Sequence, residues 1–248
     1  MKKFIFTIFT LFCVSCFSIG VGMIGANGNG AIAYMSGDLF AATNSTGMYG
    51  IYVGDSGKMI SIDSDDQGGI YYGVWGDGTF VYVACGNDGV RSYSVGEKGI
   101  LTYEDSDDQG DSHQAVWGDG TFVYIACGNS GVRSYSVDGN GDFTLEDTSV
   151  TSGAYQGVWG DGTFVYVACA AAGLRSYSVD ENGDFTLEDT SSKTGDHRDV
   201  WGDGTFIFVA WSTGGVLSYS VDVNGNLTYE DTLDVGYACE DVWAPLGE

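Results

Sequence analysis

Short apolar segments alternate with glycine-rich polar turns along most of the chain, and no helical periodicity follows residue 26. In the stretch from Ile70 to Asp105 the apolar segments cover 70–75, 79–85, 90–95 and 100–105. The second segment contains FVYVAC, which is apolar on both faces and typical of a strand covered by neighbours on each side. The fourth alternates apolar and polar residues, as does a strand with one face in water. The pattern therefore predicts a sheet of four antiparallel strands that runs from a buried to an exposed side.

This four-strand pattern recurs with a period of 42 residues, which is the spacing from Trp75 to Trp117. A period of about 40 to 45 residues with four short strands is typical of the blades of a β-propeller. A degenerate first copy begins near Ile32, so the sequence holds five copies and the first strand of a sixth. We predict an all-β, five-bladed propeller over residues 31–248. Five tryptophans, each preceded by valine, mark one position of the repeat: Trp75, Trp117, Trp159, Trp201 and Trp243.

The sixth copy suggests how the ring closes. We expect Val242 and Trp243 to supply the inner strand of the first blade, whose own tryptophan position holds Ala33. Closure would remove the open sheet edges that invite pairing with other chains. Two alternatives stay open: residues 32–36 form that inner strand themselves, or the chain is an incomplete member of a larger ring.

Two turns recur in the copies with little change, which indicates a structural role. Asp-Gly follows the Val-Trp pair and is a strong signal for a tight hairpin, since both central residues favour positive φ. The second turn, at 138–142, 180–184 and 222–226, resembles the start of a calcium loop. Phe143 occupies the place of that loop's glycine, and no bidentate glutamate follows. We therefore expect hairpin turns, with no metal and no cofactor.

The first 30 residues have the features of a secretory signal, namely MKK followed by an apolar run over 4–26. The run is also long enough for an uncleaved membrane anchor. A small-x-small site ends at Ala33, and Ala26 offers a second cleavage site. Cys16 lies where a lipobox places its acylated cysteine, although Cys13 replaces the usual leucine of that motif. We expect an extracytoplasmic protein, secreted or attached to the cell surface, and leave the mode of processing open.

A formal net charge of −25 excludes nucleic acid as a partner, because phosphate binding needs clustered lysine and arginine. High net charge favours solubility, and we expect a monomer that meets a membrane only through its N-terminal segment. Cys85, Cys127 and Cys169 share one repeat position, so they lie on different blades and too far apart for a disulfide. We interpret them as small buried side chains.

Positions that differ between copies are free to carry something specific. They are the connections between the second and third strands (86–88, 128–130, 170–172 and 212–214) and the segments before each inner strand. Strand direction puts both sets on one rim, here called the variable rim, and the recurring turns on the other, the uniform rim. Candidate ligand-binding residues are the pairs just before each Val-Trp, here called the lead-in pairs: Tyr71 and Tyr72, His113 and Gln114, Tyr155 and Gln156, His197 and Arg198, Cys239 and Glu240.

Both histidines of the protein fall in lead-in pairs, so the mouth of the central channel is either a polar plug or a ligand site. Convergence of His113, His197 and Cys239 would suit zinc. We expect no metal, because ring geometry would have to bring these three side chains together.

The units GVRSYSVDGNGDFTLEDT and AGLRSYSVDENGDFTLEDT, together with VWGDGTFVYVAC, resemble the repeats of LVIVD-type surface proteins. More remotely, they resemble lactonase-like propellers. The first resemblance implies an exported or surface-attached protein without an assigned chemistry, and the second implies hydrolysis of a sugar lactone. Lactonase-like propellers usually have seven blades, so none of their catalytic residues is carried over to this five-copy chain.

We therefore expect an exported or surface-attached binding module that contacts a protein or a glycan through the variable rim, and we do not expect catalysis. A lactonase-like hydrolase at the channel mouth is the first alternative. A glycan-binding propeller is the second, in which Tyr72 or Tyr155 stacks on sugar rings. In the hydrolase, the groups able to handle protons or an oxyanion would be His113, His197, Arg198 and Glu240.

Overall fold

The computed structural model describes residues 23–27, 30–35, 38–43, 47–53, 58–65, 67–191, 193, 195–212 and 214–242. These residues form β-strands joined by turns, with one short 3-10 helix at Glu97–Gly99. Within these ranges, no helix has the length and apolar character needed to cross a membrane. The lipidation candidate Cys16 and most of the predicted signal segment lie outside them.

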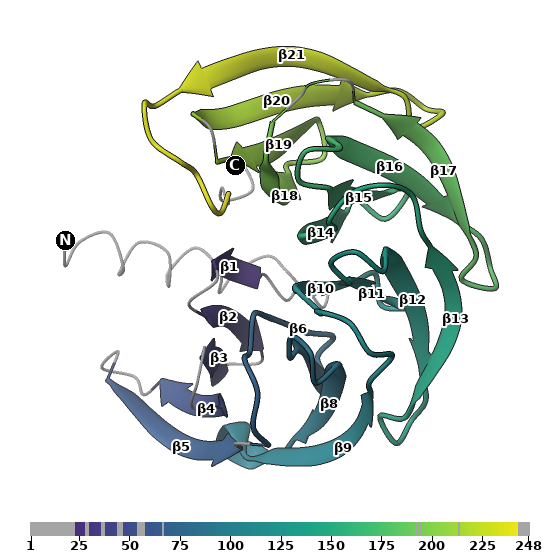
Figure 1. The fold of residues 1–248 in the computed structure, drawn as a ribbon. Coiled ribbons are helices and arrows are strands. Elements are labelled where there is room, and N and C mark those ends of the chain that lie inside the picture. Colours follow the sequence, from purple (N-terminus) through teal and green to yellow (C-terminus); the bar gives the residue numbers. More distant parts are fainter. Residues whose placement is uncertain are drawn as a thin grey trace.

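The strands form five antiparallel sheets that stand side by side around a common centre, like blades (Figure 1). The first blade contains β1 (Met23–Asn27), β2 (Gly30–Met35), β3 (Asp38–Thr43), β4 (Gly47–Val53) and β5 (Met59–Asp65). The second contains β6 (Gly73–Gly76), β7 (Phe80–Ala84), β8 (Val90–Val95) and β9 (Leu101–Asp107). The third contains β10 (Ala115–Gly118), β11 (Val123–Ala126), β12 (Val132–Val137) and β13 (Phe143–Ser149). The fourth contains β14 (Gly157–Gly160), β15 (Val165–Ala168), β16 (Leu174–Val179) and β17 (Phe185–Thr190), and the fifth contains β18 (His197–Gly202), β19 (Phe206–Trp211), β20 (Gly215–Val221) and β21 (Leu227–Asp234).

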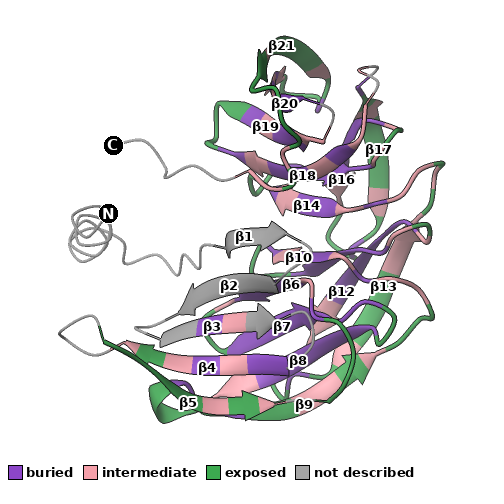
Figure 2. Cartoon of the chain, turned by 60° about the vertical axis from the view of Figure 1, so that its left-hand side comes forward, coloured by how far each residue is buried: buried purple, intermediate pink, exposed green. Residues whose placement is uncertain are grey.

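The predicted gradient from buried to exposed strands is confirmed. The inner strands follow one another around the centre, with contacts from β2 to β6, from β6 to β10, from β10 to β14 and from β14 to β18. Every residue of β7 is buried, whereas the outer strand β13 has only exposed and half-buried residues. Figure 2 shows the same contrast within two blades, with β8 and β12 largely purple and the outer strands β9 and β13 largely green and pink. The second to fifth blades therefore have the four antiparallel strands that the 42-residue repeat predicts, and the first has a fifth strand, β1.

The recurring Val-Trp-Gly motif packs one blade on the next. A Cβ built on Gly118 would lie 2.5 Å from the ring of Trp75, and one on Gly160 would lie 2.6 Å from the ring of Trp117. Each tryptophan also stacks on an aromatic residue of its own second strand, as Trp117 does on Tyr124 with ring centroids 5.8 Å apart. The motif recurs because every junction needs a flat ring on one blade and a bare backbone on the other.

The recurring turns are hairpins closed by aspartate. In the first turn, Asp77 Oδ1 accepts the backbone N–H groups of Thr79 at 2.7 Å and Phe80 at 2.8 Å. In the calcium-like turn, Asp138 Oδ1 accepts the N–H groups of Asn140 and Asp142 at 2.7 and 3.1 Å. The carboxylates serve the turn backbone itself, as expected for Asx turns.

The first blade differs from the predicted closure. β2 occupies its inner position and pairs with β3 over its whole length, and β1 pairs with the free side of β2. The structure therefore has the alternative in which the N-terminal residues form the inner strand themselves. β1 lies within the 1–30 segment that we predicted to be a signal or anchor. Trp243 lies outside the described residues, and Figure 1 shows the first and fifth blades on the two sides of an opening.

The described C-terminal residues lie against the fifth blade. Cys239 donates its backbone N–H to the carbonyl of Trp211 at 3.3 Å, and Val242 donates to Asp199 Oδ2 at 3.2 Å. The lead-in segments of other blades contact the preceding blade at equivalent positions, as in the bridge between Ala170 and His197. The sixth copy thus begins where the inner strand of a sixth blade would begin.

Candidate functional site

The first residue is buried between two blades in four of the five lead-in pairs, the exception being Cys239, which is half-buried. Tyr71, His113, Tyr155 and His197 have no exposed surface. The backbone explains this placement, because His113 forms a β-bridge with Gly86 of the preceding blade. These four side chains therefore lie within the blade junctions and do not form a wall of the channel mouth.

Three of these side chains, those of Tyr71, His113 and Tyr155, each contact an arginine near the start of the third strand of a blade. Arg91 Nη1 donates to the Tyr71 hydroxyl at 2.7 Å, and Arg133 Nη1 lies 3.1 Å from His113 Nε2. The guanidinium of Arg175 lies over the ring of Tyr155, 5.1 Å from its centroid. Our sequence reasoning missed these buried arginines. The available signal was a charged residue inside the otherwise uncharged strand pattern VRSYSV, which is LRSYSV in the fourth blade.

His113 is held by the backbone in one tautomer. Its Nδ1 lies 2.7 Å from the carbonyl of Asp111 and 3.2 Å from that of Gly86, so Nδ1 carries the hydrogen and Nε2 accepts from Arg133. Burial, together with the charge of Arg133, lowers the pKa of His113 below its usual value despite the carbonyl contacts. A neutral histidine buried in this way ties two blades together.

His197 occupies the position equivalent to His113, at the junction of the fourth and fifth blades. Its Nδ1 contacts the carbonyls of Gly195 at 3.0 Å and Ala170 at 3.1 Å. Leu217 holds the place of the arginine in this copy, and Nε2 has no hydrogen-bond partner among the described residues. The two histidines belong to different junctions. In the part of the chain that the structure describes, no three His, Cys, Asp or Glu side chains are placed to hold a metal.

The cysteines at the shared repeat position are buried and unpaired, in agreement with our interpretation. Burial raises the pKa of Cys85, Cys127 and Cys169 to about 12, so each thiol keeps its proton. Cys239 is also a free thiol and is half-buried beside the fifth blade.

The second residue of each lead-in pair reaches solvent. Arg198 links this set, since it contacts Gln156 Oε1 at 3.3 Å, Asp196 Oδ2 at 2.5 Å and Glu240 Oε2 at 3.7 Å. The structure therefore brings together three predicted residues from successive blades. We call the whole set the polar row; it consists of Tyr72, Gln114, Gln156 and Arg198, which are half-exposed, and Glu240, which is exposed.

Asp199 lies next to the polar row and is buried. Desolvation, followed by the nearby carboxylate of Asp241, raises the pKa of Asp199 well above its usual value. Its Oδ2 accepts the N–H of Val242, so this carboxyl group helps to hold the C-terminal segment. The available sequence signal was an acidic residue at a position where the preceding copies have Gly73, Ala115 and Gly157.

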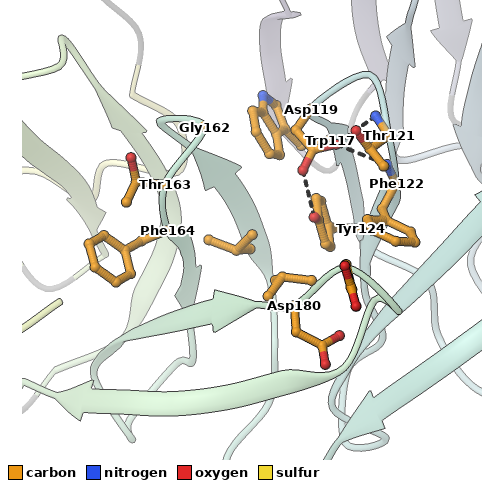
Figure 3. Close-up of a pocket in the computed structure, with 12 residues that line it drawn as sticks. Trp117, Asp119, Thr121, Phe122, Tyr124, Gly162, Thr163, Phe164 and Asp180 are labelled. Atoms are coloured by element: carbon orange, nitrogen blue, oxygen red, sulfur yellow. Dashed lines mark hydrogen bonds between the residues drawn. The ribbon is translucent and has the colours of Figure 1, made fainter. Parts of the chain in front are cut away.

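A separate cavity of about 260 Å³ lies between the third and fourth blades at the uniform rim (Figure 3). Trp117, Phe122 and Tyr124 form its apolar lining, and Asp119 and Asp180 lie at its edge. Both carboxylate oxygens of Asp119 already have hydrogen-bond partners within the blade, because Oδ2 accepts from the Tyr124 hydroxyl at 2.7 Å and Oδ1 accepts from backbone N–H groups. Most lining residues recur at the same positions in the neighbouring copies, so the cavity follows from blade packing.

The comparisons with known proteins concern the fold. No protein-family model matches the chain, and no curated protein sequence matches it. A functionally unknown protein from Desulfotomaculum acetoxidans has a TM-score of 0.71 at 11% identity, with 88% of this chain and 80% of that chain covered. Virginiamycin B lyase from Staphylococcus aureus has a TM-score of 0.62 at 10% identity, with 87% and 82% covered. Sqt1 from Chaetomium thermophilum, solved with the N-terminus of ribosomal protein L10, has a TM-score of 0.61 at 11% identity, with 77% and 57% covered.

Identities this low carry the fold and not the activity. The solved structures are propeller-like proteins, and they support a β-propeller without supporting the LVIVD type. Membership of that family stays a prediction, as do the predicted surface attachment and the more remote lactonase likeness.

Proposed function

We propose that the protein is an exported β-propeller that binds a partner protein through its variable rim. The observation that carries the proposal is the polar row. It consists of solvent-reaching side chains from successive lead-in segments, three of which are linked through Arg198. Along the copies its residues are Tyr, Gln, Gln, Arg and Glu, whereas the turns of the uniform rim repeat. A rigid scaffold that presents a variable polar line is suited to recognition.

The charge of the rim favours a basic partner segment. The exposed carboxylates of the variable rim include Asp88, Asp108 and Glu240, the last a member of the polar row, and the whole chain carries a formal charge of −25. Complementary charge speeds association and selects against acidic partners. Sqt1, a neighbour in fold, was solved with a protein N-terminus bound, which is consistent with peptide recognition by a propeller.

The burial of the lead-in residues weighs against the two alternatives. A hydrolase at the channel mouth needs a solvent-reaching proton carrier, whereas both histidines are buried in blade junctions. Arg198 and Glu240 also face each other across 3.7 Å. For glycan binding, Tyr155 has no exposed ring to stack on a sugar, which leaves only the half-exposed Tyr72.

Binding of a fluorescent lysine-rich peptide, measured by anisotropy beside a glutamate-rich peptide of equal length, tests the proposal. The variant Asp88→Asn/Asp108→Asn/Glu240→Gln should weaken binding by roughly fivefold or more. The matched control removes three exposed charges from the uniform rim, as Asp142→Asn/Glu181→Gln/Asp184→Asn, and should change binding by less than about twofold.

A second variant, Gln114→Ala/Gln156→Ala, changes the polar row without changing charge and should also weaken binding. Equal losses in the two charge variants, with no loss in the glutamine variant, would mean that bulk charge alone attracts the peptide. That result, or the absence of binding by the wild type, would refute recognition at the variable rim.

Export is the other half of the proposal, and processing bears directly on the first blade. Cleavage after Ala33 would remove β1 and most of β2, and would empty the inner position that we predicted for Val242 and Trp243. Cleavage after Ala26 would leave β2 whole. Mass spectrometry of the protein recovered outside the cytoplasm should show a new N-terminus or an acylated Cys16. A chain found only in the cytoplasm would refute export.

A further inference from the structure

One of the three junction arginines lacks the partners that the other two have. Arg175 is 3% exposed, and neither Nε nor Nη1 has a hydrogen-bond partner among the described residues. Its Nη2 donates to the carbonyl of Ser152, and its guanidinium faces the ring of Tyr155. A buried cation with two N–H-bearing nitrogens left unpaired is costly, because desolvation is not offset by hydrogen bonds.

The other two arginines have carboxylates nearby. Asp88 acts electrostatically on Arg91, and Arg133 acts on Asp111. At the positions equivalent to Asp88 and Asp111, the fourth blade and its lead-in segment have Ala172 and Gly153. The acidic pairs before the second and third blades are also lost, since Asp65-Asp66 and Asp107-Asp108 become Ser149-Val150. In a chain with a net charge of −25, the surroundings of Arg175 have lost each of these carboxylates.

The turn beside Arg175 is also strained. Ala170 has a φ of +43°, whereas the equivalent residues in the preceding copies are Gly86 and Gly128, with φ values of +56° and +51°. An L-residue with a side chain is disfavoured in this region, and such strain is found most often where a segment serves a function. The turn at Ala170 thus differs from the equivalent turns of the second and third blades in two respects: its backbone is strained, and the carboxylates near the arginine are missing.

We propose that Arg175 is the centre of an oxyanion-binding site, for a small ligand with a carboxylate or a phosphate group, at the variable rim between the third and fourth blades. The oxyanion takes the place of the missing carboxylates and accepts hydrogen bonds from the unpaired guanidinium nitrogens. Small residues lie beside the site: the carbonyl of Ser152 accepts from Arg175, and Gly153 packs against Ala172. The ligand enters when the strained turn at 169–173 shifts outward.

This site is separate from the polar row and does not depend on peptide binding. The test is a calorimetric titration of the wild-type protein with inorganic phosphate and, separately, with succinate, at constant ionic strength set by sodium chloride. The two arms distinguish a phosphate site from a carboxylate site. Saturable binding of at least one anion is expected. No saturable binding of either anion would overturn the proposal.

Two variants locate the binding. Arg175→Met removes the cation and should weaken anion binding by about tenfold or more. Ala172→Asp supplies an internal carboxylate and should weaken it to a similar extent. This second variant has a precedent in the chain: Asp88 lies against Gly69 in the second blade, and Ala172 lies against Gly153 in the same way. It is therefore expected to fold even if Arg175→Met does not.

Ala171→Asp is the matched control, because it adds the same charge at the neighbouring exposed position. It should keep most of the affinity, within roughly threefold of the wild type. If Ala172→Asp and Ala171→Asp bind the anion equally well, the ligand does not sit on Arg175 and the proposal is wrong.

Discussion

The backbone contacts repeat from blade to blade on both rims of the propeller, but the side chains repeat only on the uniform rim. On the uniform rim, Asp77, Asp119, Asp161 and Asp203 each accept the same two backbone N–H groups, so one turn is built four times. On the variable rim, the bridges between blades also repeat, from Gly86 to His113 and from Ala170 to His197. The side chains on those bridges are not uniform, because the bridge from Gly128 leads to Tyr155 and Ala170 stands where the other two bridges have glycine. A recurring side chain thus marks what every blade needs, and a changing one marks a place open to a specific role.

The largest expected effect breaks a recurring contact. Gly160→Ala places a Cβ 2.6 Å from the ring of Trp117 and should lower the free energy of unfolding by about 3 kcal/mol, because neither the strand nor the half-buried ring, which stacks on Tyr124, can move easily. Urea unfolding monitored by circular dichroism measures it. Gly139→Ala is the control, since nothing lies within 4 Å of that position and a change within about 0.5 kcal/mol is expected. Equal stabilities would contradict the packing role of the motif.

A smaller effect separates the two members of a lead-in pair on the variable rim. His113→Ala removes a buried ring and the acceptor of Arg133, and should cost about 2 kcal/mol of unfolding free energy. Gln114→Ala alters the half-exposed neighbour and should cost less than about 0.5 kcal/mol. The same denaturant experiment compares the two. A reversed order would mean that the first residue of the pair does not tie the blades together.

The smallest effect concerns pH where the variable rim meets the C-terminal segment. Because burial raises the pKa of Asp199, the folded protein holds a proton that the unfolded chain releases near pH 4. Stability therefore falls as the pH rises from about 4 through the raised pKa. Asp199→Asn keeps an acceptor for Val242 without a charge, and should flatten this dependence and add about 1 kcal/mol at pH 7. Thermal unfolding at several pH values measures it; an unchanged slope would show that Asp199 is not the responsible group.

The strand pattern was predicted well from the sequence, with an informative exception. The predicted segments 79–85 and 90–95 match β7 and β8 closely, whereas the predicted inner strand 70–75 begins at Gly73 in the structure. The residues before Gly73 bond outside the regular ladder. In the third blade, for example, His113 precedes the inner strand in the same way and donates its N–H to the carbonyl of Gly86 in the second blade. Strand ends next to a neighbouring blade depend on that neighbour, and the local pattern of one strand does not contain it.

The candidate site was predicted in part. The lead-in pairs were found because they vary between copies, and the structure places three of their members in contact at Gln156, Arg198 and Glu240. The pattern did not reveal which member of each pair is buried. Arg91, Arg133 and Arg175 recur at one position in three copies, so a comparison that looked for varying positions missed them. The difference at Arg175 appears only when the residues around its guanidinium are known, because Ser152 and Tyr155 lie far from it along the chain.

The sequence alone determined the repeat unit, its four strands and its two aspartate turns, because each of these depends on residues within one period of 42. The tertiary structure alone decided that β2 fills the inner position of the first blade, that the C-terminal segment lies on the fifth, and that the histidines are buried. These outcomes depend on contacts between blades. Whether a side chain at a bridge is buried depends on the residues of the adjoining blade. The sequence of a single repeat does not include those residues.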